Sequence, residues 1–158
     1  MINIKNIYRE IFKAIKNDTK LLDLLGVEYK DVDENTFLTN LRVQVIEGSA
    51  PDDLLNNYAT RLCVHELNGK YQGLIDEIAY VSIDIHITQD KNMQTGILSD
   101  IVQRVIELMD SKERKKEGKQ PLDIGLYGLI YSSRSFDNKA SSTGWEKYTI
   151  TFSYKYIK

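Results

Sequence analysis

The end of the chain, residues 145–157, alternates between apolar and polar side chains more regularly than any other part. Apolar and aromatic residues fill the even positions from Tyr148 to Tyr156, while lysine, threonine and serine fill the odd positions between them. Successive side chains of a β-strand point to opposite faces, so this pattern predicts a long strand with one buried face. Such a strand needs a sheet to join and a second layer to cover its apolar side.

Four earlier segments also have the residue pattern of strands. In the clearest of them, β-branched residues fill the odd positions from Val81 to Ile87, and polar residues fill the even ones. In the last, the alternation changes phase at Gly125 or Gly128, which predicts a bend or bulge. The four segments are residues 41–46, 60–67, 78–88 and 122–131.

The dipeptide Asn68-Gly69 is a strong hairpin signal, because both residues tolerate the positive φ that a tight turn requires. It predicts a turn whose second strand begins at Lys70 or Tyr71. The alternative is a longer arm that runs from Leu62 to Ile87, with its tip near Lys70–Asp76.

Two segments have helical periodicity, with apolar residues three and four positions apart. They are residues 3–16 and residues 95–110, the second with Thr95 as its expected N-cap. A short helix is expected over Lys20–Leu25, capped by Asp18 or Thr19 and ended by Gly26. We expect the mixed stretch 27–40 to be a connector, 89–92 a polar break, 111–120 an exposed loop and 132–143 a turn or hairpin tip.

These elements predict an α+β fold, in which a mixed, mostly antiparallel sheet has two long helices packed on one face. The chain has 158 residues and shows no internal repeat or low-complexity linker. A single domain spanning residues 1–158 is therefore expected, with protruding loops or an arm near 47–77 and 132–144.

Charge and cysteine content exclude several classes of function. The 21 basic and 23 acidic residues give a net charge of −2, which produces no general attraction to nucleic acid or to anionic lipid. The single cysteine, Cys63, cannot form a disulfide within the chain, which favours a reducing compartment. Charged residues interrupt every apolar run, so we expect no signal peptide and no membrane span, and a protein made in the cytoplasm.

Residues that could carry out chemistry are few and scattered. Asp84 and His86 share one strand face and could act as an acid–base pair, and Cys63 with His65 could form a nucleophile and its base. No motif accompanies either pair, so we interpret Asp84 and His86 as solvated or in a subunit contact, and Cys63 as a half-buried strand residue.

Two charged stretches are also interpreted as solvated surface. The acidic residues Asp31, Asp33 and Glu34 lack the glycine and the distal glutamate of a calcium loop. The basic run Lys112–Lys119 is interrupted by Glu113 and Glu117 and contains no aromatic residue, which disfavours nucleic-acid binding. We therefore predict no enzyme activity, no metal site and no cofactor.

The order and spacing of four stretches resemble the tail terminator (tail completion) proteins of tailed bacteriophages. The most distinctive stretch is the ending, GWEKYTITFSYKYI, in which Gly-Trp precedes the alternating strand. The charged insert 111–121 and the long region 47–77 depart from the family pattern and could mark either a head-side connector or an adaptation to a particular tail. The four stretches are NIYREIFKAIKNDTKLLDLLGV at the start, Ala79–Asp110, Leu122–Phe136 and Gly144–Ile157.

The resemblance implies a structural subunit of the virion, in the tail or neck. Proteins of this family form a hexameric ring that caps the tail tube, stops its polymerisation and docks to the head–tail connector, while DNA passes through the lumen unread. The implied partners are other copies of the chain, the tail tube protein and the connector protein, with the tail sheath as a further candidate. The alternatives are a head-side neck connector or a small nucleic-acid-associated binding module using the Lys112–Lys119 loop.

Ring closure would need contact residues on the protruding parts of the chain. Tyrosine is enriched at protein interfaces because it combines apolar area with a hydrogen-bonding tip, and the chain has ten tyrosines. The predicted contacts with other subunits or with the tube are Tyr58, Tyr71, Tyr80, Asp84, His86 and Arg134.

Overall fold

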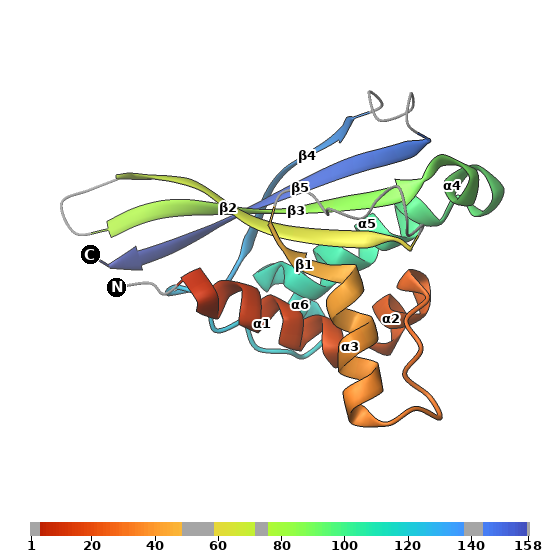
Figure 1. Cartoon of the computed structure of the whole chain (residues 1–158). Coiled ribbons are helices and arrows are strands. Elements are labelled where there is room, and N and C mark those ends of the chain that lie inside the picture. Colours follow the sequence, from red (N-terminus) through yellow and green to blue (C-terminus); the bar gives the residue numbers. More distant parts are fainter. Residues whose placement is uncertain (1–3, 49–58, 72–75, 138–143, 158) are drawn as a thin grey trace.

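The computed structural model describes residues 4–48, 59–71, 76–137 and 144–157, and Figure 1 shows their arrangement. In chain order the elements are α1 (Ile4–Lys16), α2 (Thr19–Leu25), α3 (Glu34–Gln44), β1 (Val45–Glu47), β2 (Arg61–Tyr71), β3 (Asp76–Thr88), α4 (Gln89–Thr95), α5 (Ile97–Met109), α6 (Ser111–Lys116), β4 (Ile130–Asp137) and β5 (Trp145–Ile157).

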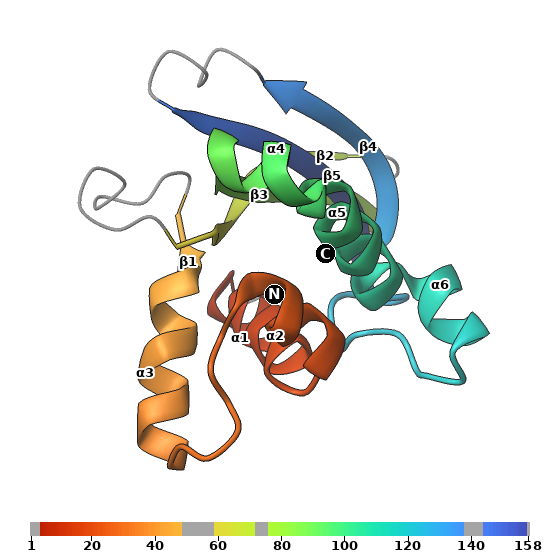
Figure 2. The ribbon, with the colours of Figure 1, turned by 90° about the vertical axis from the view of Figure 1, so that its right-hand side faces the viewer.

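The described strands form one sheet in the order β1-β2-β3-β5-β4. β1 runs parallel to β2, and every other neighbouring pair is antiparallel. Figure 2 shows the helices gathered on one side of this sheet. The predicted α+β class, with a mixed, mostly antiparallel sheet and helices on one face, is confirmed.

The core lies between the sheet and the helices. The odd-numbered residues of β3 from Val81 to Ile87 are fully buried there, as are Ile150 and Phe152 of β5. The helices contribute the stripes that their periodicity predicts, with Ile11 and Ile15 of α1 also fully buried. Burying side chains of this size contributes about 1.5–3 kcal/mol each, which makes this layer the main source of stability.

The predicted connector 27–40 and strand 41–46 are largely wrong, because residues 34–44 form the helix α3. Asp33 begins it as the N-cap, with its carboxylate accepting a hydrogen bond from the amide of Thr36 at 2.7 Å. Phe37 and Leu41 are buried four residues apart, whereas Val43 is 40% exposed. Helical spacing of the buried residues therefore prevails over the short alternation in the sequence, and β1 has only three residues.

The predicted strand 122–131 is also wrong over most of its length, since β4 begins at Ile130. Gly125 and Gly128 have φ angles of +59° and +72°, which place them in turns of an irregular loop and not in a bulged strand. The loop runs close beside β5, where the amide of Leu126 donates to the carbonyl of Lys155 at 2.9 Å. Residues 132–137, expected in a turn, belong to β4, and residues 138–143 lie outside the described part of the chain.

Two stretches expected to lack regular structure are short helices. Residues 89–92 open α4, and most of 111–120 is α6, whose N-cap is the Asp110 carboxylate. The helix α5 begins at Ile97 and not at Thr95, but the Thr95 hydroxyl still accepts a hydrogen bond from the Ile97 amide at 3.3 Å. The short helix α2 has the expected Asp18 cap and ends at Gly26.

No tight hairpin forms at Asn68-Gly69. β2 continues through this dipeptide to Tyr71, with a register shift between Leu67 and Lys70. The longer-arm alternative agrees with this pairing, and its tip at 72–75 lies outside the described residues. Figure 1 shows β2, β3 and β5 extending together beyond the start of α1.

Candidate functional site

The face of the sheet opposite the helices, here called the helix-free face, carries three of the six predicted contact residues, Tyr80, Asp84 and His86. Directly paired residues of antiparallel strands point to the same face, so the strand register assigns the side chains. From one end to the other, its rows are Arg61–His86–Lys147, Cys63–Asp84–Thr149–Ser135, His65–Ser82–Thr151–Ser133 and Leu67–Tyr80–Ser153–Ile130.

A buried polar cluster occupies the middle of the helix-free face. Asp84, only 3% exposed, accepts hydrogen bonds from the Thr149 hydroxyl at 2.7 Å and lies 2.9 Å from Nε2 of His65. The hydroxyls of Ser82 and Thr151 are 3.1 Å apart in the next row. A buried carboxylate with partners on both neighbouring strands ties β2, β3 and β5 together.

This cluster differs from the pairs considered on sequence grounds. Asp84 pairs across strands with His65 and not along its own strand with His86, and the cross-strand contact has no sequence signal. His86 is buried as well, so neither Asp84 nor His86 is solvated, and the other interpretation of this pair, a subunit contact, stays a prediction. Cys63 is fully buried rather than half-buried, and burial, followed by the charge of Asp84, raises its pKa to about 12.

The other predicted contact residues are not brought to one place. Tyr80 lies on the helix-free face and is partly exposed. Arg134 is exposed on the edge strand β4, opposite Ile150, and therefore on the helix-covered side. Tyr71 ends β2, and its side chain, like the whole of Tyr58, lies outside the described part.

One end of the helix-free face is apolar and accessible. Leu67 is 43% exposed beside Tyr80, and Ile130 and Tyr127 are 38% and 62% exposed at the other edge of the sheet. Ile78, Tyr127 and Ile130 help to line a hollow of about 270 Å³. Accessible apolar patches of this kind are typical of protein-contact surfaces.

The helical layer contains a charged centre that the sequence analysis missed. Arg104 lies on the buried side of α5, where its guanidinium donates to both carboxylate oxygens of Asp18 and to Glu107 and Glu117. A lone arginine between Ile101 and Val105, on the apolar stripe of a helix, was the signal that could have revealed it. Because three carboxylates surround one cation, this centre fastens α2 and the end of α6 to α5.

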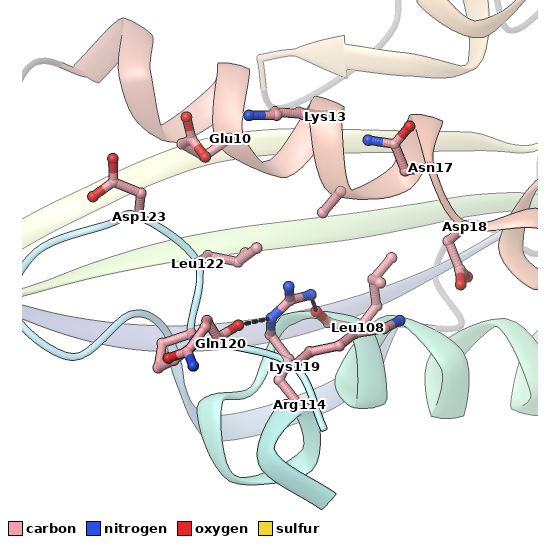
Figure 3. A pocket seen from close by; sticks show the side chains of 12 residues that line it. Glu10, Lys13, Asn17, Asp18, Leu108, Arg114, Lys119, Gln120, Leu122 and Asp123 are labelled. Atoms are coloured by element: carbon pink, nitrogen blue, oxygen red, sulfur yellow. Dashed lines mark hydrogen bonds between the residues drawn. The ribbon is translucent and has the colours of Figure 1, made fainter. Parts of the chain in front are cut away.

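A groove of about 350 Å³ lies between α1 and the segment 119–123, and Figure 3 shows the side chains that line it. Arg114 is turned toward the segment and donates to the carbonyls of Gln120 at 2.6 Å and Leu108 at 2.8 Å. These two hydrogen bonds use the Arg114 guanidinium to hold the chain after α6 in place. They stabilise one wall of the groove.

The charged stretches have structural roles. Asp33, from the acidic stretch, caps α3. Among the described residues, no group of three or more His, Cys, Asp or Glu side chains is placed to hold a metal ion. In and after α6, Lys116 pairs with Glu113 at 2.9 Å, and Lys119 with Glu117 at 3.3 Å. No helix in the described ranges is long and apolar enough to cross a membrane.

Comparison with known proteins finds similarity in structure only. No family model and no curated protein matches the sequence. Among solved structures, a chain from the virion of a native gene transfer agent (GTA) particle superposes with a TM-score of 0.60. The match covers 96% of this chain and 94% of that chain at 10% sequence identity, so the two share a fold over almost their whole lengths.

Proposed function

We propose that this chain is a structural subunit of a phage-like virion and has no enzymatic activity. The observation that carries the proposal is the fold shared with a chain of the GTA virion, over almost the whole length of both proteins. A fold by itself does not define a function. Here, however, the surface of the molecule supports the same conclusion, because its accessible features suit contact with other proteins.

The cluster around Asp84 is poorly suited to catalysis. A cysteine nucleophile reacts as the thiolate, and the raised pKa of Cys63 keeps it protonated at neutral pH. Asp84 is committed to Thr149 and His65, and both contacts join neighbouring strands of the sheet. The cluster therefore supports a role in holding a rigid sheet.

Within the virion, we assign the chain to a ring at the head-proximal end of the tail, as a tail terminator. A closed ring needs two unlike surfaces on each subunit that complement each other. The two edges of this sheet are unlike, with the exposed strand β4 on one side and the partly covered strand β2 on the other. The proposed ring is a hexamer that caps the tail tube, contacts the connector and lets DNA pass.

Electron microscopy of the purified chain, alone and mixed with assembled tail tubes, tests this assignment. We expect sixfold rings, or caps on one end of the tubes, and arrest of further tube growth. A chain that stays monomeric at all concentrations and leaves tube ends bare would contradict the assignment. Rings that bind the connector but not the tube would instead indicate a head-side neck connector.

The alternative of a nucleic-acid-associated module has less support. In and after α6, Lys116 and Lys119 are paired with glutamates and Arg114 is bonded to backbone, which leaves Lys112 and Lys115 as the exposed cations of that helix without a described partner. Two cations give weak binding that salt removes readily. In a gel-shift assay at physiological salt, we expect the wild type and the Lys112→Glu, Lys115→Glu double variant alike to leave DNA unshifted. Salt-sensitive DNA binding by the wild type that the double variant abolishes would support the nucleic-acid module instead.

A further inference from the structure

The outer edge of β4 is open over most of its length. At its start the edge is occupied, because the amide of Tyr131 donates to the carboxylate of Asp110 at 2.8 Å. From Ser132 to Phe136 every side chain is exposed, and among the described strands β4 pairs only with β5. An open edge of this kind presents backbone donors and acceptors that another strand can use.

The opposite edge of the sheet is open in a different place. β1 covers β2 only from Leu62 to Val64, and the amide of Gly48 then donates to the carbonyl of Val64 at 2.9 Å. Beyond this point no described strand pairs with the outer side of β2, which continues to Tyr71. The free part of this edge therefore begins at about His65.

The directions of the two edges are compatible. β2 is antiparallel to β3, β3 to β5, and β5 to β4, so β4 runs opposite to β2 within the sheet. If subunits are related by rotation about an axis roughly along the strands, β4 of one meets β2 of the next as an antiparallel pair. One sheet could then continue from subunit to subunit, with two unlike edges in each contact.

The side chains at these edges are also complementary. Arg134 lies opposite Ile150, and Glu66 lies opposite Val81, so both point to the helix-covered side of the sheet. The strand pairings place Arg134 level with Val64, whose outer side β1 and Gly48 already occupy. A shift of two residues along β2 brings Arg134 level with Glu66, and closed sheets require such a stagger between strands.

Neither charge is fully used within the subunit. Arg134 is exposed and has no ion pair or hydrogen bond among the described residues. Among the described residues, Glu66 accepts one hydrogen bond, from the Tyr154 hydroxyl to Oε1 at 3.0 Å, and its Oε2 is available to a second donor. We propose that β4 of one subunit pairs with β2 of the next, and that Arg134 forms a salt bridge with Glu66 across this contact.

This inference rests on the proposed ring. Native mass spectrometry over a range of concentrations distinguishes a failure of the edge contact from a failure of the ring itself. We expect Arg134→Glu alone, and Glu66→Arg alone, to raise the concentration for half-assembly by at least about tenfold. Mixing the two variants should restore assembly with equal numbers of each, because every contact then joins opposite charges. Isotope labelling of one variant reports that ratio.

Two controls keep the test decisive. Tyr154→Phe removes the hydrogen bond to Glu66 but leaves the Glu66 carboxylate in place, so this variant should assemble as the wild type does. Urea unfolding of each monomer shows whether a variant has lost its fold. Wild-type rings that tolerate both charge reversals, or a mixture that fails to restore them, would overturn the edge contact and leave the ring standing. A wild-type chain that never assembles, even on tube ends, would overturn both.

Discussion

The Arg104 guanidinium of α5 donates two hydrogen bonds, of 2.9 and 2.7 Å, to the carboxylate of Asp18, the N-cap of α2. The Asp18 carboxylate also accepts from the amide of Leu21 at 3.0 Å, so it caps its own helix at the same time. Both side chains are almost fully buried, at 6% and 8% exposure. The pair therefore joins the N-terminal helices to α5 at a point where water cannot replace a lost partner.

Removal of Asp18 should be strongly destabilising. Asp18→Ala leaves the buried guanidinium of Arg104 without its main partner and also removes a helix cap, with an expected loss of about 3–5 kcal/mol. Urea denaturation followed by circular dichroism measures this loss. The matched control is Lys16→Ala, which breaks the exposed pair with Glu34 and should change stability by less than about 1 kcal/mol. Similar losses in both variants would show that the buried pair has no special weight.

The same centre predicts how stability depends on pH. Burial alone would raise the pKa of Asp18, but hydrogen bonds from Arg104 and the Leu21 amide outweigh it and hold the pKa below its ordinary value. The hydrogen bond from Arg104 also lowers the pKa of Glu117. A carboxyl whose pKa is lower in the folded than in the unfolded chain stabilises the fold at pH values above its unfolded-state pKa, which is about 4. This stabilisation is lost as the pH falls through the folded-state pKa.

Unfolding free energies at several pH values test this expectation. The difference between wild type and Asp18→Asn should be constant above about pH 5 and should narrow below about pH 4, because protonation makes the wild-type carboxyl neutral too. A difference that stays constant into the acid range would show that the Asp18 charge contributes nothing.

The long periodic elements were predictable because each carries its signal within its own residues. The alternation in β3 and β5 and the stripe on α1 depend only on which side faces the core. The helix α3 was missed because Leu41, Val43 and Val45 also fit a strand, and only packing shows that Leu41 faces the core while Val43 does not. Short apolar runs do not distinguish helix from strand.

The contacts at the candidate sites were not predictable in the same way. Asp84 contacts His65 on the neighbouring strand, and Arg104 contacts Asp18, which is 86 residues away in the sequence. Such pairs depend on strand register and helix docking, which no local pattern encodes. The exposure of Tyr80 and Arg134, in contrast, agrees with their selection as surface residues, although their partners stay a prediction.

Gly125 should be intolerant of any side chain. It has a φ angle of +59°, and a Cβ atom there would collide with the carbonyl oxygen of Lys155, which accepts from the Leu126 amide. Gly125→Ala should therefore cost about 2–4 kcal/mol, since strain adds to overlap. Gly118→Ala is the control, because Gly118 has a φ of +73° but open space around it, and should cost about 1 kcal/mol. Equal losses of unfolding free energy in the two variants, measured by urea denaturation, would show that Gly125 is not in close contact with β5.

The thiol of Cys63 should be inert in the folded protein. It is fully buried on β2, and burial together with the nearby charge of Asp84 raises its pKa to about 12, so both access and thiolate fraction are low. Ellman's reagent should release less than about a tenth of one equivalent from the native chain within minutes, and one equivalent after denaturation in guanidinium chloride. Ser135→Cys places a thiol at an exposed position of β4 in the same row of the sheet and should react at once. Rapid reaction of native Cys63 would instead mean that the helix-free face opens to solvent, and the case against a cysteine nucleophile would fail with it.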